Sequence, residues 1–222
     1  MKKVTFYYVR HGRTLFNKVG KMQGWCDSPL TEEGINNAYE AKEVLKNITF
    51  DHIYTSTSER CIDTADIIKG EQNIPISHEK GLKETNFGNF EGVTIANHLE
   101  EIDKRRLTTF DWSDVGGENI EMLSERVMKE YQKIYDESAD GDKILIVSHG
   151  SVFLHMLHFM FGLDRDYSME LISTGERKDM PCPNGYVAEF YREGDEYTLV
   201  HLNKRDDSVI EKLYLRKREN SL

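Results

Sequence analysis

Residues 4–12 read VTFYYVRHG, an apolar run of β-branched and aromatic residues that ends in an Arg-His-Gly tripeptide. A run of this length and composition predicts a buried strand. Residues 144–150 repeat the arrangement as ILIVSHG. Open α/β sheets carry their functional groups in the crevice beyond the carboxyl ends of the strands. We therefore predict that His11 and His149, although far apart in the sequence, share one pocket.

Strand-like and helix-like patterns alternate along the rest of the chain, which favours an α/β fold. We expect helices over 31–47, 58–69, from 119 onward and over 152–161, strands over 52–55 and 74–78, and a hairpin with strands over 186–191 and 197–202. In the first helix, the expected apolar side includes Ile35 and Tyr39. Together these elements predict one domain over 1–222, a three-layer α/β/α sandwich with a mostly parallel central sheet.

Three segments stand outside this alternation. Residues 94–117 are polar, and we expect them to form a small inserted cap over the pocket. The rings of Phe110 and Trp112 within it could contact a leaving group, although burial in a core is the more common fate of such side chains. Residues 164–184 could form a second wall. Residues 203–222 are heavily charged, which predicts a surface helix or a partly ordered tail.

Composition limits the class of protein. With 222 residues, 38% of them hydrophobic, the chain can bury a full core as one domain. It has no apolar run long enough to span a membrane and no signal-peptide pattern, so we expect a soluble, cytoplasmic protein without a membrane partner. The net charge of -10 opposes nucleic-acid binding. The 3 cysteines are widely spaced, which indicates neither a disulfide framework nor a zinc site.

The turn around His11 suggests phosphoryl chemistry. Glycine after the histidine permits a tight turn whose following backbone amides point toward an anion. A neutral imidazole can attack phosphorus and form a phosphohistidine that water later hydrolyses. Adjacent guanidinium groups lower the pKa of such a ring and a bound phosphate raises it, so its net shift stays open at this point. A histidine after a strand is also often structural.

Arg60 supplies a second indication, because the sequence places it in the first turn of a helix. The helix dipole disfavours a cation there unless an anion is bound nearby. Guanidinium groups bind phosphate oxygens in a planar, bidentate way, so Arg10 and Arg60 can form a pair around one phosphoryl group. The alternative is a solvated arginine that pairs with Glu59 or Asp63.

Glu84 is the candidate proton donor. Its apolar neighbours Leu82, Phe87 and Phe90 would raise the carboxyl pKa by desolvation, while nearby arginines would lower it. Glu91 in the same loop is the alternative acid. Either carboxylate could also be an ordinary exposed loop residue.

The order and spacing of these residues resemble the histidine phosphatase superfamily, which includes the phosphoglycerate mutases. The resemblance spans roughly residues 4 to 203. The matching pieces are RHG at 10–12 with Thr14 and Asn17, QGWCD at 23–27, PLT at 29–31 with Gly34, Arg60 with Thr64 and Ala65, Glu84 with Phe87 and Gly88, Glu91 with Gly92, and SHG at 148–150. Each motif is short, but the ensemble is specific.

The resemblance implies that His11 is the nucleophile and that Glu84 acts first as the acid and then as the base for water. It further implies that three side chains hold the equatorial oxygens of the phosphoryl group: Arg10, Arg60 and, as a charged donor, His149. The rest of the phosphate-binding site would be formed by Asn17, Gln23, Gly24 and the Gly150 amide. No metal or other cofactor is expected, because arginines and histidines can supply the positive charge. His155 and His158, three positions apart on an apolar helix, are better explained by packing than by metal binding.

Two activities use this machinery. A phosphatase admits water to the phosphohistidine, whereas a mutase retains and reorients a phosphorylated intermediate. The interval between Glu84 and His149 is short beside that of glycolytic mutases, and Gln23 stands where mutases commonly have threonine or serine. Trp25 favours a mutase instead. The basic residues 104–106 are best explained as a solvated helix face rather than a second-phosphate site.

We therefore expect a metal-independent phosphomonoester hydrolase that acts on a small phosphorylated metabolite. A phosphoglycerate mutase-type phosphotransferase is the main alternative. A non-catalytic phosphate-binding protein of the same fold is a third. The identity of the substrate stays open, and exposed edge strands would allow a homodimer.

Overall fold

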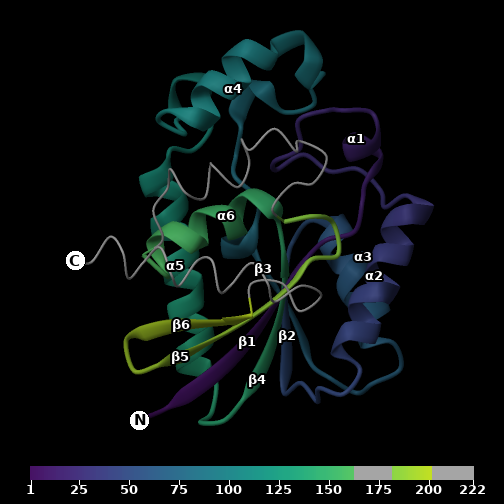
Figure 1. Cartoon of the computed structure of the whole chain (residues 1–222), viewed down its shortest axis with the longest axis vertical. Coiled ribbons are helices and arrows are strands. Elements are labelled where there is room, and N and C mark those ends of the chain that lie inside the picture. Colours follow the sequence, from purple (N-terminus) through teal and green to yellow (C-terminus); the bar gives the residue numbers. More distant parts are fainter. Residues whose placement is uncertain (163–181, 202–222) are drawn as a thin grey trace.

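The computed structural model describes residues 1–162 and 182–201, and their centre is a six-stranded sheet with the order β3-β2-β4-β1-β5-β6 (Figure 1). The strands are β1 (Lys3–Arg10), β2 (His52–Ser56), β3 (Ile76–Glu79), β4 (Lys143–Ser148), β5 (Val187–Glu193) and β6 (Glu196–His201). The first four run parallel, β5 runs antiparallel to β1, and β6 antiparallel to β5. The predicted, mostly parallel α/β sheet is confirmed.

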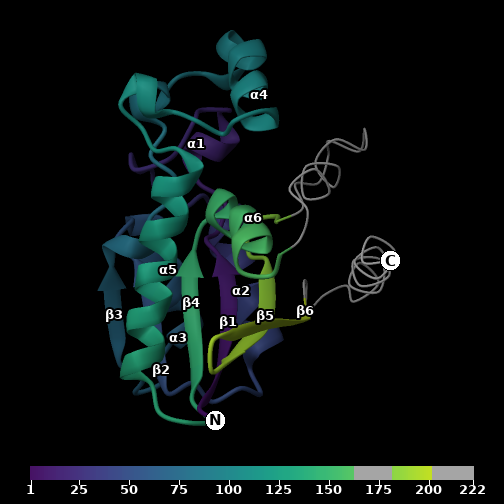
Figure 2. The ribbon, with the colours of Figure 1, turned by 90° about the vertical axis from the view of Figure 1, so that its left-hand side faces the viewer.

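Helices cover both faces of the sheet (Figure 2). They are α1 (Leu15–Lys18), α2 (Glu32–Leu45), α3 (Glu59–Lys69), α4 (Leu99–Leu107), α5 (Ile120–Glu137) and α6 (Gly150–Phe159). Side chains alternate along β1, so Phe6 and Tyr8 join the core under α5 and α6 while Tyr7 and Val9 join the core under α2 and α3. Burial on both sides explains why this strand reads as a continuous apolar run.

The helix starts agree with the sequence signals. Thr31 caps α2 by accepting from the Gly34 amide at 3.1 Å, and the side chain of Asn119 caps α5 in the same way. Two expectations about α2 are wrong: Ile35 and Tyr39 are exposed. The buried side of the helix consists of three small residues and a leucine, Gly34, Ala38, Ala41 and Leu45.

The hairpin turn is shorter than the polar sequence suggested. Glu193 pairs with Glu196, so only Gly194 and Asp195 form the loop between β5 and β6. Gly194 has a positive φ of 61°, the backbone conformation that a tight hairpin requires. The strands therefore extend further into the charged stretch than expected.

The 94–117 segment lies beyond the carboxyl ends of the strands, at the top of Figure 1, and includes α4. It is less separate from the core than its polarity suggested. Trp112 is fully buried and makes edge-on ring contacts with Phe87 and Phe90 at centroid distances of 5.0 and 5.4 Å. Phe110 packs on the ring of His155 in α6. Phe110 and Trp112 are therefore both buried in the core, as is more common for such rings.

Within the described residues, none of the helices combines the length and the apolar character that a membrane crossing needs. Two predictions fall outside the described part of the chain. They are most of the second wall, residues 164–181, and the whole of the charged tail, residues 203–222.

Candidate active site

The sheet register brings the two histidine turns together. Arg10 at the end of β1 lies opposite Ser148 at the end of β4, and the His11 amide donates to the Ser148 carbonyl at 3.0 Å. The next residues are therefore neighbours: the rings of His11 and His149 have centroids 5.3 Å apart. Both side chains are buried. The predicted convergence of the two strand ends is confirmed.

The ring of His11 is held in one tautomer. Its Nδ1 lies 2.8 Å from the Gly12 carbonyl oxygen, which can only accept, so Nδ1 carries the hydrogen and Nε2 keeps a lone pair. Burial, together with the charges of Arg60 and Arg10, holds the pKa of this imidazole well below its usual range. His11 is therefore neutral near neutral pH. Asn184 fixes its backbone by donating from Nδ2 to the His11 carbonyl at 2.9 Å.

Both ring nitrogens of His149 have partners. Arg60 Nη2 lies 3.0 Å from Nδ1, and because a guanidinium can only donate, Nδ1 must accept. The hydrogen is then on Nε2, which lies 2.9 Å from Ser56 Oγ. Burial, followed by the charge of Arg60, lowers the pKa of this ring well below its usual value. The expectation of a charged donor is thus wrong for the site as it stands, because His149 is neutral.

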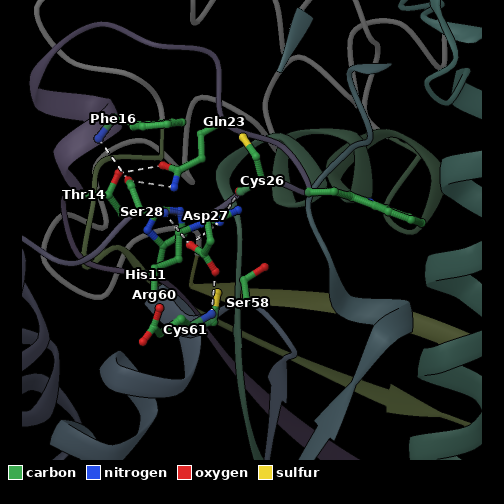
Figure 3. A network of polar contacts seen from close by, with 12 residues as sticks. His11, Thr14, Phe16, Gln23, Cys26, Asp27, Ser28, Ser58, Arg60 and Cys61 are labelled. Atoms are coloured by element: carbon green, nitrogen blue, oxygen red, sulfur yellow. Dashed lines mark hydrogen bonds and ion pairs between the residues drawn. The ribbon is translucent and has the colours of Figure 1, made fainter. Parts of the chain in front are cut away.

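Arg60 belongs to the polar network in Figure 3, where it lies beside Asp27. Its side chain is fully buried, and Nη1 forms an ion pair with Asp27 at 2.8 Å and donates to the Cys26 carbonyl at 3.1 Å. Nη2 also donates to the Gly24 carbonyl at 2.8 Å. The alternative of a solvated arginine paired with Glu59 or Asp63 is wrong. The loop that contains Gly24 and Asp27 folds over the start of α3 and supplies the partners instead.

Arg10 is the second buried arginine that acts on His11. It is buried, its Nη1 donates to the Cys182 carbonyl, and its charge contributes to the lowered pKa of His11. Gly150 packs directly against it, since a Cβ at that position would come within 3.0 Å of Arg10 Nε. The two predicted guanidinium groups therefore lie close enough to act on the same imidazole.

Glu84 occupies the start of α6. One carboxyl oxygen accepts from the amides of Thr85 at 2.9 Å and Val152 at 3.2 Å, and the other accepts from the Ser151 amide at 3.1 Å. These donors and the positive end of the helix favour the ionised form. Burial outweighs them and raises the carboxyl pKa above its ordinary value. Glu84 is thus a buried carboxyl whose protonated form is favoured relative to a solvated one.

Glu91, the alternative acid, has a structural role. Its Oε1 accepts from the amides of Trp25 at 2.7 Å and Phe87 at 3.2 Å, and its Oε2 accepts from the Cys26 amide. These bonds join the loop that holds Arg60 to the loop that holds Glu84. Gly24 lies within this joint, where a Cβ would come within 2.4 Å of the Thr85 carbonyl oxygen.

Asn17 and Gln23 belong to a network at the start of α1. Asn17 Oδ1 accepts from the Thr14 amide at 3.2 Å, and Gln23 Oε1 accepts from the Thr14 hydroxyl at 2.6 Å. Asn184 Nδ2 reaches Asn17 Oδ1 at 3.4 Å as well as the His11 carbonyl. Asn17 is therefore connected to His11 through Asn184, and the predicted cradle residues border the histidine turn.

Gly12 is needed for a reason other than the one expected. Its amide donates to Thr64 Oγ1 at 3.1 Å rather than pointing toward an anion site. A Cβ on Gly12 would lie 2.1 Å from the Gly34 carbonyl oxygen. The glycine thus permits two backbones to touch. The amides that follow it, which we expected to point toward an anion, donate within the protein instead: that of Arg13 to Asn37 Oδ1 at 3.3 Å and that of Thr14 to Asn17 Oδ1 at 3.2 Å.

The basic residues of α4 do not form one solvated face. Lys104 is exposed, and Arg105 binds Asp114 and Glu101 at 2.6 and 3.2 Å. Arg106 instead lies with Nη2 3.3 Å from the Met22 sulfur and is half-buried. Burial lowers its pKa, and the charges of Asp103 and then Glu84 act in the opposite direction. One cation of this cluster is therefore within electrostatic range of the candidate acid.

His155 and His158 have different surroundings. His155 is buried with its ring centroid 3.8 Å from that of Phe110, whereas His158 is exposed. Packing therefore explains His155, whereas the side chain of His158 is not packed into the core. Across residues 1–162 and 182–201, no three His, Cys, Asp or Glu side chains form a group that could hold a metal ion.

Three site residues had no role in the sequence analysis: Asp27, Ser56 and Asn184. Asp27 stood inside a motif that matched the family, which was the only signal for it. Ser56 ends β2, the strand beside β4, so the sheet order places it next to His149. Asn184 precedes β5, the other neighbour of β1. The positions of Ser56 and Asn184 at the site become visible only when the strand order is known.

Comparisons with known proteins agree with this geometry. The profile of the histidine phosphatase superfamily (branch 1) matches residues 6–205. A 2,3-bisphosphoglycerate-dependent phosphoglycerate mutase of Cytophaga hutchinsonii is 36% identical over 175 residues, 75% of this chain and 82% of the mutase. The uncharacterized phosphatase PhoE of Bacillus subtilis is 35% identical over 156 residues, 70% of this chain and 77% of that protein.

Comparison with solved structures agrees with these sequence matches. The solved structure of Bacillus stearothermophilus YhfR superposes with a TM-score of 0.77 at 28% identity, covering 89% of this chain and 95% of that one. The profile spans most of the chain, including both histidine turns, Arg60 and Glu84. With two strand-end histidines beside a buried arginine and a buried glutamate, this chain belongs to the histidine phosphatase superfamily.

Proposed function

We propose that this protein is a phosphomonoester hydrolase that needs no metal ion and works through a phosphohistidine on a small phosphorylated metabolite. The observation that carries the proposal is the state of His11. Its Nδ1–H is bound to the Gly12 carbonyl, and its lowered pKa keeps the lone pair on Nε2 available near neutral pH. A neutral imidazole in this tautomer is the nucleophile that phosphoryl transfer requires.

In the first step, Nε2 of His11 attacks phosphorus, and the bond from phosphorus to the ester oxygen breaks as the N–P bond forms. Glu84 gives its proton to the departing oxygen. The raised pKa of this carboxyl supports the role, because a buried acid holds its proton closer to neutral pH. The phosphorylated ring becomes cationic, and the Gly12 carbonyl accepts from its Nδ1–H.

In the second step, water attacks phosphorus and the Glu84 carboxylate takes its proton. The N–P bond breaks, its electron pair returns to Nε2 of His11, and inorganic phosphate leaves. The same carboxyl therefore serves as acid and then as base, and its position at the start of α6, directly after the His149 turn, supports this. Each cycle returns the site to its starting protonation state.

Arg10 and Arg60 supply the positive charge for the three non-bridging oxygens. Arg60 Nε–H supports this role because it is buried and has no hydrogen-bond partner among the described residues. His149 would add its Nε2–H, which donates to Ser56 in this structure. Donors of this kind are typically worth about 3 to 4 kcal/mol of transition-state stabilisation each. Asn17, Gln23, Gly24 and Gly150 complete the proposed walls.

Arg106 supports a narrower substrate class. A half-buried guanidinium near Glu84, with a thioether as its hydrogen-bond partner, suits a leaving group that carries its own negative charge. The same feature supports the second candidate function, a phosphoglycerate mutase-type phosphotransferase. Names of relatives include both activities. The hydrolase remains the primary proposal. The homodimer that the sequence analysis allowed remains a prediction.

The first test is turnover of p-nitrophenyl phosphate in EDTA between about pH 5 and 8, the range in which a histidine and a raised carboxyl titrate. We expect hydrolysis and an acid-labile phosphoenzyme that is absent from His11→Asn. Folded protein without turnover would reject the hydrolase, and acid-labile label on the variant would reject His11 as the nucleophile.

The second test separates hydrolase from mutase. The protein is incubated with 3-phosphoglycerate and 2,3-bisphosphoglycerate, and 2-phosphoglycerate and inorganic phosphate are both measured. We expect phosphate release to dominate; efficient isomerisation with little free phosphate would favour the mutase. Arg106→Gln should raise KM for phosphoglycerate but not for p-nitrophenyl phosphate, with Arg105→Gln as the matched control.

A further inference from the structure

Arg126 on α5 binds the loop that contains Glu84. Its Nη1 donates to the carbonyls of Gly81 and Lys83, both at 2.9 Å, and its Nη2 donates to the Glu84 carbonyl at 3.2 Å. One guanidinium thus bonds three carbonyls within four consecutive residues. A planar fork with five donors can do this, whereas a lysine ammonium cannot match the pattern.

Glu118 orients Arg126 and reaches the same loop. Its Oε1 accepts from Arg126 Nε at 2.7 Å, and its Oε2 accepts from Arg126 Nη2 at 2.8 Å, a bidentate ion pair. Oε2 also accepts from the Asn86 amide at 2.9 Å, and the Glu118 amide donates to the Asn86 carbonyl at 2.8 Å. The pair therefore holds the loop on both sides of Glu84.

The Glu84 carbonyl has a second donor. Trp25 Nε1 lies 2.9 Å from the same oxygen, so the backbone of Glu84 is bound from α5 by Arg126 and from the Arg60-binding loop by Trp25. The Glu84 carboxyl meets the amides of α6. Backbone and carboxyl are thus fixed by separate elements, which restricts the direction in which the carboxyl can point.

We propose that Arg126, oriented by Glu118, is a positioning residue that places the Glu84 carboxyl for proton transfer to the leaving group. The inference rests on the proposed role of Glu84 as general acid. Arg126 binds the carbonyls of this loop and not the carboxyl, so its effect on the acid passes through the backbone of residues 81–86. Its charge also contributes to the lowered pKa of His149, which is why a charge-keeping variant is needed in the test. General acid catalysis depends on hydrogen-bond distance, and a displaced acid loses its advantage first for leaving groups that need the proton most.

The test compares phenyl phosphate with p-nitrophenyl phosphate, two substrates of similar size whose leaving groups differ in acidity. For Arg126→Met, we expect kcat/KM to fall about tenfold or more for phenyl phosphate relative to p-nitrophenyl phosphate, within the range that general acids supply. Arg126→Lys keeps the charge without the fork and should retain most of this selective loss. Arg105→Met, which removes an arginine that binds Asp114 and Glu101, is the matched control and should leave the ratio unchanged.

The Glu84→Gln background shows whether Arg126 acts through the acid. There the Arg126→Met substitution should cause no further change in the ratio, because the group it positions no longer carries a proton. Thermal unfolding of each variant checks that it is folded, and the milder Glu118→Gln should shift the ratio in the same direction if Arg126→Met does not fold.

The outcomes separate the two proposals. An unchanged ratio in folded Arg126→Met, while Glu84→Gln shows the selective loss, overturns the positioning role and leaves the hydrolase proposal standing. A ratio fully restored in Arg126→Lys replaces positioning by a simple charge effect and also overturns it. If Glu84→Gln itself shows no selective loss, the acid role fails and the inference fails with it.

Discussion

The turns after β1 and β4 have the same sequence motif, a histidine and a glycine after a buried strand, yet the two histidine rings have different hydrogen-bond partners. His11 satisfies Nδ1 with its own next carbonyl, and its Nε2 keeps the lone pair. His149 has Arg60 on Nδ1 and Ser56 on Nε2. Similar motifs thus leave Nε2 of one ring with its lone pair and hold the other ring between two side chains, and the neighbouring elements make the difference.

The glycines that follow these histidines also differ in what they pack against. Gly12 allows contact between two backbones, because a Cβ there would lie 2.1 Å from the Gly34 carbonyl oxygen. Gly150 allows a side chain to approach, since the nearest atom to its added Cβ would be Arg10 Nε at 3.0 Å. The first turn is packed against another backbone segment, whereas the second is packed against the side chain of the buried Arg10.

The largest expected effect is that of His11→Asn. Asparagine keeps a polar side chain of similar reach but has no nucleophilic nitrogen, so hydrolysis of p-nitrophenyl phosphate should fall by about 10,000-fold or more and no phosphoenzyme should form. Steady-state turnover and acid-labile labelling check this. Residual turnover within about tenfold of the wild type would assign the attack to another group and would remove the contrast between the two histidines.

Alanine at the two glycines should separate folding from activity. Gly12→Ala forces a backbone clash and should destabilise the protein by several kcal/mol, about 3 or more, with loss of soluble folded protein. Gly150→Ala displaces a side chain instead, so it should fold with a smaller stability loss, of order 1 kcal/mol, but hydrolyse substrate more slowly because Arg10 shifts. Denaturant unfolding and turnover are measured on both. The opposite ranking of stabilities would contradict the steric explanation.

Sequence patterns could predict the fold and the catalytic candidates because both depend on local signals. Buried parallel strands read as apolar runs, helix caps are short polar motifs, and two strands that end in His-Gly, taken with the motifs around Arg60 and Glu84, indicate the site. This was enough to place the ends of β1 and β4 together.

The partners of these residues could not be predicted, because they come from distant loops. Asp27 meets Arg60 only after the 24–27 loop folds over α3. Arg105 and Arg106 are adjacent in sequence, but a helix turns about 100° per residue, so one binds surface carboxylates while the other turns toward Met22. The polar composition of α4 does not show which of its residues face the core and which face solvent.

His149→Asn should have a smaller effect than His11→Asn. The variant removes a donor and also the acceptor of Arg60 Nη2, but it leaves the nucleophile intact, so turnover should fall by about 100-fold. A phosphoenzyme should still form on His11. Rapid-mix labelling with a phosphate donor shows whether it does. Complete loss of label in a folded variant would show that both histidines are required for the attack step.

The smallest expected effect is on the pH dependence of stability, and it tests whether both rings are neutral. His11 and His149 have folded-state pKa values well below the usual 6.5. As the pH falls below about 6.5, each ring takes up a proton in the unfolded chain but not in the folded one, so stability declines by up to about 1.4 kcal/mol per pH unit for each histidine. Replacing either ring by asparagine should therefore reduce the slope by up to one proton, measured by urea unfolding at several pH values on the acid side of neutrality. If only His11→Asn flattens the slope, His149 is protonated in the folded protein and the two turns differ in charge as well as in hydrogen bonding.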